Sequence, residues 1–554
     1  MMRKRHAHKE KVLLVNITRL GDMLQATPTI AGMKLENPEC KVTVVVEKQF
    51  DAVCRIIPNI DEVVSIDLGM TVRSLARGGE GVIDAYDYIS DFVDDLKERQ
   101  FDYCLNMSSS AYTAMLLNAI GIKRSGGWSS DDEGYRVIES DWARLFASSV
   151  FHQNRQYNSL NLVDVFRCSA DVELHPNQLM LDVSKENEEF AERTVRSAGF
   201  TNTGPLVVVQ AGASQAKRQW APAKFIRFIK VLIEEYDARI VLTGAKKEAT
   251  IVDPIEQGCS SPNVLNLCGK TSIPELAAVL KSASLLVTGD TGPMHIAAAV
   301  GTPSVSMFLA SAFAFETGPY SADNIILQPL IGCGPCNPNK PCARPDCHDQ
   351  IDPEFLAKLC AWRLDGNSNR LPDGWLDPTK VIAYRTTFDQ FGFYNLEEIS
   401  DSRYDSFSKV RDAYRMLWLE DLAGYDMRGY KQTSPNRRAT LSLMNEGLTG
   451  LERVVDCAKQ GQRLISDLCR YIRDERSAPS LLGQVNERIS ELDREIEQIG
   501  YHYSHLGPIT RMFVFAKENL SGTEALDLAS QMTGIYADLE RRCFKLGSFY
   551  TELS

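Results

Sequence analysis

Residues 285–308 read LLVTGDTGPMHIAAAVGTPSVSMF, and this stretch decides the fold class. Its apolar start, LLVTG, predicts a buried strand, and the following MHIAAAV predicts a helix that ends at Gly301. The next run, SVSMF, predicts a second strand. A strand, a glycine-containing loop, a helix and another strand form the repeating unit of a parallel sheet covered by helices.

The same alternation recurs along much of the chain. Apolar, β-branched runs predict earlier strands at 11–17, 41–47, 62–67 and 101–107. The pattern then restarts near residue 205 with PLVVVQ, ARIVLTG and VLNLCG. We therefore expect an α/β protein with two consecutive domains, in residues 1–190 and 200–365.

The remainder of the chain has a different character. Residues 366–380 are rich in Gly, Asn, Pro and Asp, which predicts a linker. Long stretches with helical periodicity follow, and they predict an α-helical extension over residues 400–554. The apolar stripes of these helices can form either an internal bundle or a surface that joins two copies into a homo-oligomer.

Composition narrows the class of protein. The 554 residues carry a net charge of -12, which argues against broad nucleic-acid binding. No apolar run approaches the roughly 18 residues that a membrane-spanning helix needs. The basic start MMRKRHAHKEK precedes an apolar stretch that is too short for a signal peptide. We expect a cytoplasmic protein without a transmembrane segment, in which most of the 14 cysteines are buried thiols.

The loop after the first predicted strand carries a carboxylate, Asp22, next to Gly21. In a parallel sheet this loop lies at the edge where ligands bind. An aspartate there can take a proton from a reacting hydroxyl, and the glycine lets the backbone turn closely. The competing interpretation is a helix N-cap.

The loop after PLVVVQ holds Gly212 and Ser214, and the adjacent cations Lys217 and Arg218 follow. A glycine loop with two cations suits a phosphate group, whose negative charge the cations neutralise. The competing interpretation is a solvated loop with Trp220 packed in the core.

The most distinctive loop is GDTGPMH, residues 289–295. It joins a strand to a helix, so its amides and the helix N-terminus predict an anion site. Asp290 cannot bind phosphate directly and either braces the loop or contacts a sugar. His295 falls in the first turn of the helix, where it is either a ligand or a packed core residue.

Four cysteines cluster within fifteen residues: Cys333, Cys336, Cys342 and Cys347. Four thiolates on a loop rich in Pro and Gly can close a tetrahedral metal site, and the CxxC spacing is a common half of such sites. Zinc and iron both suit this donor set, and His348 can replace one ligand. Two local disulfides or free thiols are the alternatives. Because a closed site leaves no open position for water, the expected role is structural.

Three of these stretches together resemble one family. LLVNITRLGDMLQATPTI, VQAGASQAKRQWAPAKF and LCGKTSIPELAAVLKSASLLVTGDTGPMHIAAAVGTPSVSMF are similar to the ADP-heptose lipopolysaccharide heptosyltransferases, the glycosyltransferases of family nine. The similarity covers roughly residues 11–360. It implies a GT-B fold, with two Rossmann-like domains facing a cleft, the first for the acceptor and the second for the nucleotide-sugar.

The resemblance also implies roles for individual residues. Asp22 matches the catalytic base, and Arg218 or Lys217 matches the cation that contacts the leaving diphosphate. The substrate-binding residues that we expect are Gly21, Gly212, Ser214, Glu248, Asp290, Thr291, Gly292, Pro293 and His295. Glu248 would hold the nucleoside. Such enzymes need no catalytic metal, since protein charge takes its place.

The implied function is inverting transfer of a sugar, with ADP-heptose as donor. The acceptor is either a lipopolysaccharide core sugar, which suggests a peripheral location at the inner membrane, or a protein side chain. The helical extension departs from the family's pattern and leaves acceptor and assembly open. A non-catalytic scaffold that binds a nucleotide-sugar, and an epimerase on the same fold, are the alternatives.

Overall fold

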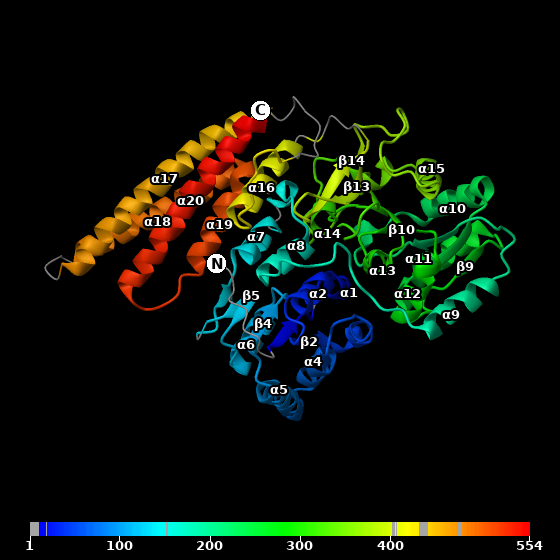
Figure 1. The fold of residues 1–554 in the computed structure, drawn as a ribbon, viewed down its shortest axis with the longest axis horizontal. Helices are drawn as coiled ribbons and strands as arrows, with labels where there is room; N and C mark the ends of the chain where they lie inside the picture. The colour runs from blue at the N-terminus through cyan, green and yellow to red at the C-terminus, as the bar shows by residue number, and fades with distance from the viewer. Residues whose placement is uncertain are drawn as a thin grey trace. The chain divides into compact units, whose positions relative to one another are not determined.

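The computed structural model describes residues 10–17, 19–131, 133–150, 153–400, 405, 407–430, 441–474 and 479–553. The chain forms two compact units. Unit 1 comprises Met1–Arg136 and Leu160–Ser402, and unit 2 comprises Val137–Ser159 and Arg403–Ser554. Figure 1 shows the elements of both along the chain.

The first sheet contains six strands in the order β3-β2-β1-β4-β5-β6. The strands are β1 (Lys11–Val15), β2 (Lys41–Glu47), β3 (Glu62–Ile66), β4 (Tyr103–Asn106), β5 (Ser125–Ser130) and β6 (Arg136–Ile138). Its helices are α1 (Leu20–Gln25), α2 (Thr27–Glu36), α3 (Asp51–Cys54), α4 (Leu68–Arg77), α5 (Glu80–Glu98) and α6 (Ala111–Ile120). β1 pairs in parallel with β2 and β4, so the chain order reverses beside β1, which is where such sheets bind ligands.

The second sheet contains eight strands in the order β14-β13-β12-β11-β10-β7-β8-β9. They are β7 (Leu206–Gln210), β8 (Arg239–Thr243), β9 (Val264–Asn266), β10 (Leu285–Gly289), β11 (Ser304–Met307), β12 (Ile325–Pro329), β13 (Val381–Phe388) and β14 (Tyr394–Glu398). Its helices are α9 (Lys185–Arg196), α10 (Pro222–Tyr236), α11 (Ala249–Cys259), α12 (Ile273–Ser282), α13 (Gly292–Val300), α14 (Ala314–Thr317) and α15 (Pro353–Leu364). Helix α8 (Leu162–Ser169) packs against α2 and β5 of the first sheet. Here the order reverses between β7 and β10.

The last two strands of this sheet were not expected from the sequence. β13 and β14 form a hairpin that pairs antiparallel to β12. β13 follows α15 only after residues 365–380, most of which were predicted as a linker, and no helix separates β13 from β14. The α/β class with two sheets is otherwise as predicted.

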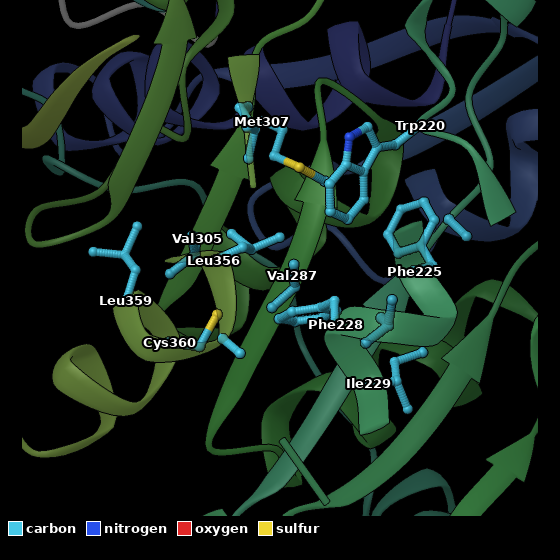
Figure 2. Packing of buried hydrophobic residues seen from close by; sticks show 14 of the residues in the cluster. Trp220, Phe225, Phe228, Ile229, Val287, Val305, Met307, Leu356, Leu359 and Cys360 are labelled. Atoms are coloured by element: carbon cyan, nitrogen blue, oxygen red, sulfur yellow. The ribbon is translucent and has the colours of Figure 1, made fainter. Parts of the chain in front are cut away.

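The core beneath the second sheet fixes the loop that follows β7. Trp220 is fully buried there, and its ring lies edge-on to Phe225 of α10, with the ring centroids 5.1 Å apart. Figure 2 shows both rings beside the buried side chains of β10 and β11. The indole therefore anchors the end of the segment that carries Lys217 and Arg218.

Unit 2 is helical, as the periodicity predicts. Its helices are α7 (Asp141–Ser149), α16 (Ser408–Asp421), α17 (Leu441–Arg473), α18 (Pro479–His502), α19 (Gly507–Glu518) and α20 (Ala525–Leu553). α17 packs against α18 and α20, which buries Ile465, Leu492 and Tyr536 within the unit. No helix in the described part of the chain is both long and apolar enough to cross a lipid bilayer.

His505 makes the stability of unit 2 depend on pH. Its side chain is buried, and burial lowers the pKa of the imidazole from 6.5 to about 4, although Glu446 opposes the shift. The folded protein therefore binds fewer protons here than the unfolded chain does between these pH values. We expect the free energy of unfolding to fall by up to about 3 kcal/mol as the pH drops from 6.5 to 4.

Chemical denaturation of the wild type and His505→Gln at pH 7 and pH 4.5 measures this effect. The loss of stability on acidification should be smaller in His505→Gln, whereas His502→Gln, which removes an exposed histidine, should behave as the wild type. Equal losses in the wild type and His505→Gln would show that the buried imidazole is not the cause.

Candidate active site

The residues singled out by sequence lie in loops at the carboxyl ends of strands. Asp22 follows β1, the Gly212 loop follows β7, Glu248 follows β8 and Asp290 follows β10. Strands β8, β7 and β10 are neighbours in the second sheet. Their loops therefore meet at one edge of that sheet, beside the point where the chain order reverses.

Asp22 occupies the first turn of α1 and is half-buried. The helix N-cap is Arg19, so Asp22 is not the capping residue. A carboxylate in the first turn is stabilised by the positive end of the helix dipole. The N-cap interpretation of Asp22 is thus wrong, and its carboxylate stays at the end of β1.

Helix α1 of the first sheet packs directly on α13 of the second sheet. A Cβ atom on Gly21 would lie 2.9 Å from Cδ2 of His295, and one on Gly292 would lie 2.9 Å from Cδ2 of Leu20. Both glycines are therefore needed for the close approach of the two helices. This contact brings the turn that carries Asp22 to the loop that carries Asp290.

A methyl group at Gly21 should disturb this contact. We expect Gly21→Ala to lower the rate of any reaction at this site by about tenfold to a hundredfold, because the added carbon displaces α1 and with it Asp22. Steady-state kinetics measure the change. Gly534→Ala is the matched control, since nothing lies within 4 Å of a Cβ atom there. Unchanged turnover in Gly21→Ala would contradict the importance of this contact.

His295 lies in the first turn of α13 and is only 5% exposed. Burial lowers the pKa of its imidazole, and the charge of Asp290 opposes this shift only in part. The ring is therefore neutral near pH 7. Its Nδ1 atom is buried without a hydrogen-bond partner among the described residues. The structure places His295 against Gly21, as a packed residue that retains one unused polar atom.

Arg218 and Asp290 form an ion pair between the loops after β7 and β10. Nη1 of Arg218 lies 3.1 Å from Oδ2 of Asp290, and both side chains are largely buried. Nε of Arg218 donates a hydrogen bond of 2.8 Å to Oγ of Ser311, in the loop after β11. The sequence analysis missed Ser311, because the surrounding run of small residues forms no recognisable motif.

The N-terminus of α13 lies beside this ion pair. Thr291 is the N-cap, and its hydroxyl forms a hydrogen bond of 2.8 Å with that of Thr288, while Pro293 stands in the first turn. The positive end of the α13 dipole, with the amide of Gly292, and the guanidinium of Arg218 together offer positive charge to an anion. The arrangement suits a phosphate group.

Glu248 lies against the Gly212 loop. A Cβ atom on Gly212 would approach Oε1 of Glu248 to 2.0 Å, so any side chain there would displace the Glu248 carboxylate. Oε2 of Glu248 accepts a hydrogen bond of 2.7 Å from the amide of Ala245, which orients the carboxylate. Ser214, in the same loop, is exposed.

The comparisons with known proteins agree with this geometry. Residues 89–345 match the model of glycosyltransferase family 9 (heptosyltransferase). This part of the chain is therefore similar to glycosyltransferase family 9. Lipopolysaccharide heptosyltransferase 3 from Escherichia coli is 27% identical over 297 residues, which cover 53% of this chain and 82% of that protein. Lipopolysaccharide core heptosyltransferase OpsX from Haemophilus influenzae is 24% identical, and the alignment covers 57% of this chain and 84% of that protein.

A solved structure supports the fold. The family 9 glycosyltransferase from Veillonella parvula superposes with a TM-score of 0.51 at 18% identity, covering 65% of this chain and 98% of that chain. The expected GT-B type of α/β fold is confirmed. The match to the glycosyltransferase family 9 model and the heptosyltransferase relatives identify the chain as a glycosyltransferase, and the scaffold and epimerase alternatives are set aside.

Lys217 and the adjacent Arg218 have different hydrogen-bond partners. Its ammonium donates hydrogen bonds of 2.8, 3.0 and 2.7 Å to the carbonyl oxygens of Asn337, Pro338 and Lys340. These carbonyls belong to the loop that carries the four cysteines. The loop after β7 and the cysteine loop are therefore joined.

The cysteine thiols lie near one another but are not arranged as a finished metal site. Burial, together with the charges of the neighbouring Cys333, Cys347 and Cys342, raises the pKa of Cys336 to about 11. Among the described residues, no three His, Cys, Asp or Glu side chains are grouped closely enough to hold a metal ion. Cys347 is buried, whereas Cys333 and Cys342 are exposed.

Proposed function

We propose that this enzyme is an inverting heptosyltransferase that takes heptose from ADP-heptose. The observation that supports this most is the contact between α1 and α13. It brings a carboxylate, Asp22, close to an anion site built from Arg218 and the α13 N-terminus. A base beside a diphosphate site is what displacement of a nucleoside diphosphate by a hydroxyl requires. The names of the relatives favour heptose as the sugar.

In the proposed reaction, the acceptor hydroxyl transfers its proton to the carboxylate of Asp22. The hydroxyl oxygen forms a bond to the anomeric carbon, and the bond from that carbon to the diphosphate oxygen breaks. The electron pair leaves with ADP, whose charge Arg218 and the N-terminus of α13 stabilise. Glu248 holds the nucleoside, and Asp290, displaced from Arg218 by the diphosphate, contacts the sugar.

The domain roles follow from this assignment. The first domain, residues 1–190, would hold the acceptor, and the second, residues 200–365, would hold the donor. The acceptor is a lipopolysaccharide core sugar or a protein hydroxyl, and the helical region would recruit a protein acceptor or join copies of the chain. Mass analysis after incubation with ADP-heptose and each acceptor class distinguishes a lipopolysaccharide acceptor from a protein acceptor.

Calorimetric binding of ADP-heptose, compared with UDP- and GDP-sugars, tests the donor. We expect selective binding of ADP-heptose, and a product whose anomeric configuration is inverted. Tighter binding of another nucleotide-sugar would overturn the heptose assignment. Failure to bind any nucleotide-sugar would overturn the donor site as a whole.

We also propose that the cysteine loop binds a structural zinc or iron ion. Four thiols on one loop are a fitting donor set, and the mutual effect of their charges shows that they lie near one another. A bound cation would favour the thiolates and close the loop. Elemental analysis of the purified protein should find about one equivalent of metal, which Cys333→Ser together with Cys336→Ser removes. Absence of metal from the wild type would overturn this assignment.

A further inference from the structure

The hydrogen bonds around Lys217 leave no capacity for a phosphate. An ammonium group has three N–H donors, and Lys217 directs them at three carbonyl oxygens of the cysteine loop. Binding a diphosphate would require these bonds to break. The adjacent Arg218 instead points to Ser311 and Asp290 at the carboxyl edge of the sheet.

A further hydrogen bond joins His348, at the end of the same loop, to the main chain of Lys217. Nε2 of His348 lies 2.8 Å from the main-chain oxygen of Lys217. Because a carbonyl only accepts, Nε2 of His348 carries the proton. The carbonyl of His348 accepts hydrogen bonds of 3.0 Å from Nε1 of Trp220 and 2.7 Å from Nζ of Lys224. His348 is 7% exposed, so these bonds are shielded from water.

The cysteine loop is also attached on the other side of Arg218. The amide of Cys336 donates a hydrogen bond of 2.9 Å to the carbonyl of Ala310. Ala310 directly precedes Ser311, which accepts from Arg218. The loop thus holds the neighbours of both Arg218 and its hydroxyl partner.

We propose that Lys217 and His348 are positioning residues, which hold Arg218 at the diphosphate by fastening residues 216–218 to the cysteine loop (residues 333–348). This rests on the proposed function, in which Arg218 receives the diphosphate. Donor binding and closure of the cysteine loop are then coupled, and the coupling works in both directions. ADP should stabilise the loop, and a loosened loop should weaken ADP binding.

The test combines two readouts on the purified full chain: the affinity for ADP, by calorimetry, and the alkylation rate of Cys336 and Cys347 by iodoacetamide, by peptide mass mapping. Lys217→Met and His348→Ala should each weaken ADP binding about tenfold and raise the alkylation rate severalfold. His348→Gln, which restores an N–H donor, should recover both values. If the wild type holds a metal ion, its loss from Lys217→Met would also show that the cysteine loop has loosened.

Controls separate this proposal from the one on which it rests. Lys230→Met, which removes an exposed lysine of α10, should change neither readout. Cys360 is fully buried and should stay unmodified in every folded variant. Arg218→Gln should weaken ADP binding about a hundredfold but keep the wild-type alkylation rate; if its ADP affinity equals that of the wild type, the proposed function fails.

One pattern would overturn the positioning role alone. If Lys217 contacts phosphate, Lys217→Met weakens ADP binding with no change in the alkylation rate, and His348→Ala changes neither ADP affinity nor the alkylation rate.

A double variant adds a further check. Lys217→Met with His348→Ala should be no worse than the more affected single variant, because both residues serve one connection.

Discussion

Replacement of Asp22 by asparagine should lower the rate of sugar transfer about a thousandfold. The change keeps the size of the side chain but removes the carboxylate that accepts the proton of the acceptor hydroxyl, a contribution typically of 10²- to 10⁴-fold. Because Asp22 lies in the first turn of α1 and not in the donor loops, ADP binding should persist. Single-turnover kinetics with saturating donor, together with calorimetry of ADP, measure both quantities.

Asp102→Asn provides the matched control for Asp22→Asn. Asp102 accepts a hydrogen bond from the amide of Lys11, at the opposite end of β1 from Asp22. We expect Asp102→Asn to transfer sugar as the wild type does. Transfer by Asp22→Asn at more than a tenth of the wild-type rate would remove Asp22 from the role of base.

Replacement of Arg218 by glutamine should weaken ADP binding about a hundredfold, equivalent to about 2.7 kcal/mol. The variant loses a cation from the diphosphate site and leaves Asp290 without its largely buried partner. The unpaired carboxylate then repels the incoming diphosphate. Equilibrium titration with ADP measures the loss, and catalysis should fall further because charge builds on the leaving group.

Two variants sharpen the Arg218 experiment. Arg227→Gln removes the α10 cation from an exposed ion pair with Glu354 of α15, and it should leave ADP affinity unchanged. Arg218→Gln combined with Asp290→Asn should bind ADP better than Arg218→Gln alone, since the repelling charge is gone. If both versions bind equally, repulsion by Asp290 makes no contribution.

Much of the fold could be predicted because its signals are local. Short apolar, β-branched runs predict β1, β2, β7 and β10, whose buried residues are the ones expected. The helical periodicity beyond residue 400 predicts the long helices of unit 2. The hairpin of β13 and β14 escaped prediction, because it follows residues predicted as a linker and only its antiparallel pairing with β12 places it in the sheet.

The candidate site was predicted in its components but not in its contacts. Asp22, Arg218 and Asp290 were expected from motifs, and their positions after strands follow from the order of elements. The packing of Gly21 on His295 joins residues more than 270 positions apart. The contribution of Ser311 and His348 could not be foreseen, since neither residue belongs to a motif that indicates such a contact.

The sequence by itself determined the α/β class, the helical extension, the loops that carry charge and the resemblance to family 9, because each depends on residues close together in the chain. Only the tertiary structure decided which cation serves which partner. Lys217 and Arg218 are adjacent and chemically alike, and their long side chains can turn in either direction. Carbonyls 120 residues away hold Lys217, and a carboxylate 72 residues away holds Arg218, so folding alone separates their roles.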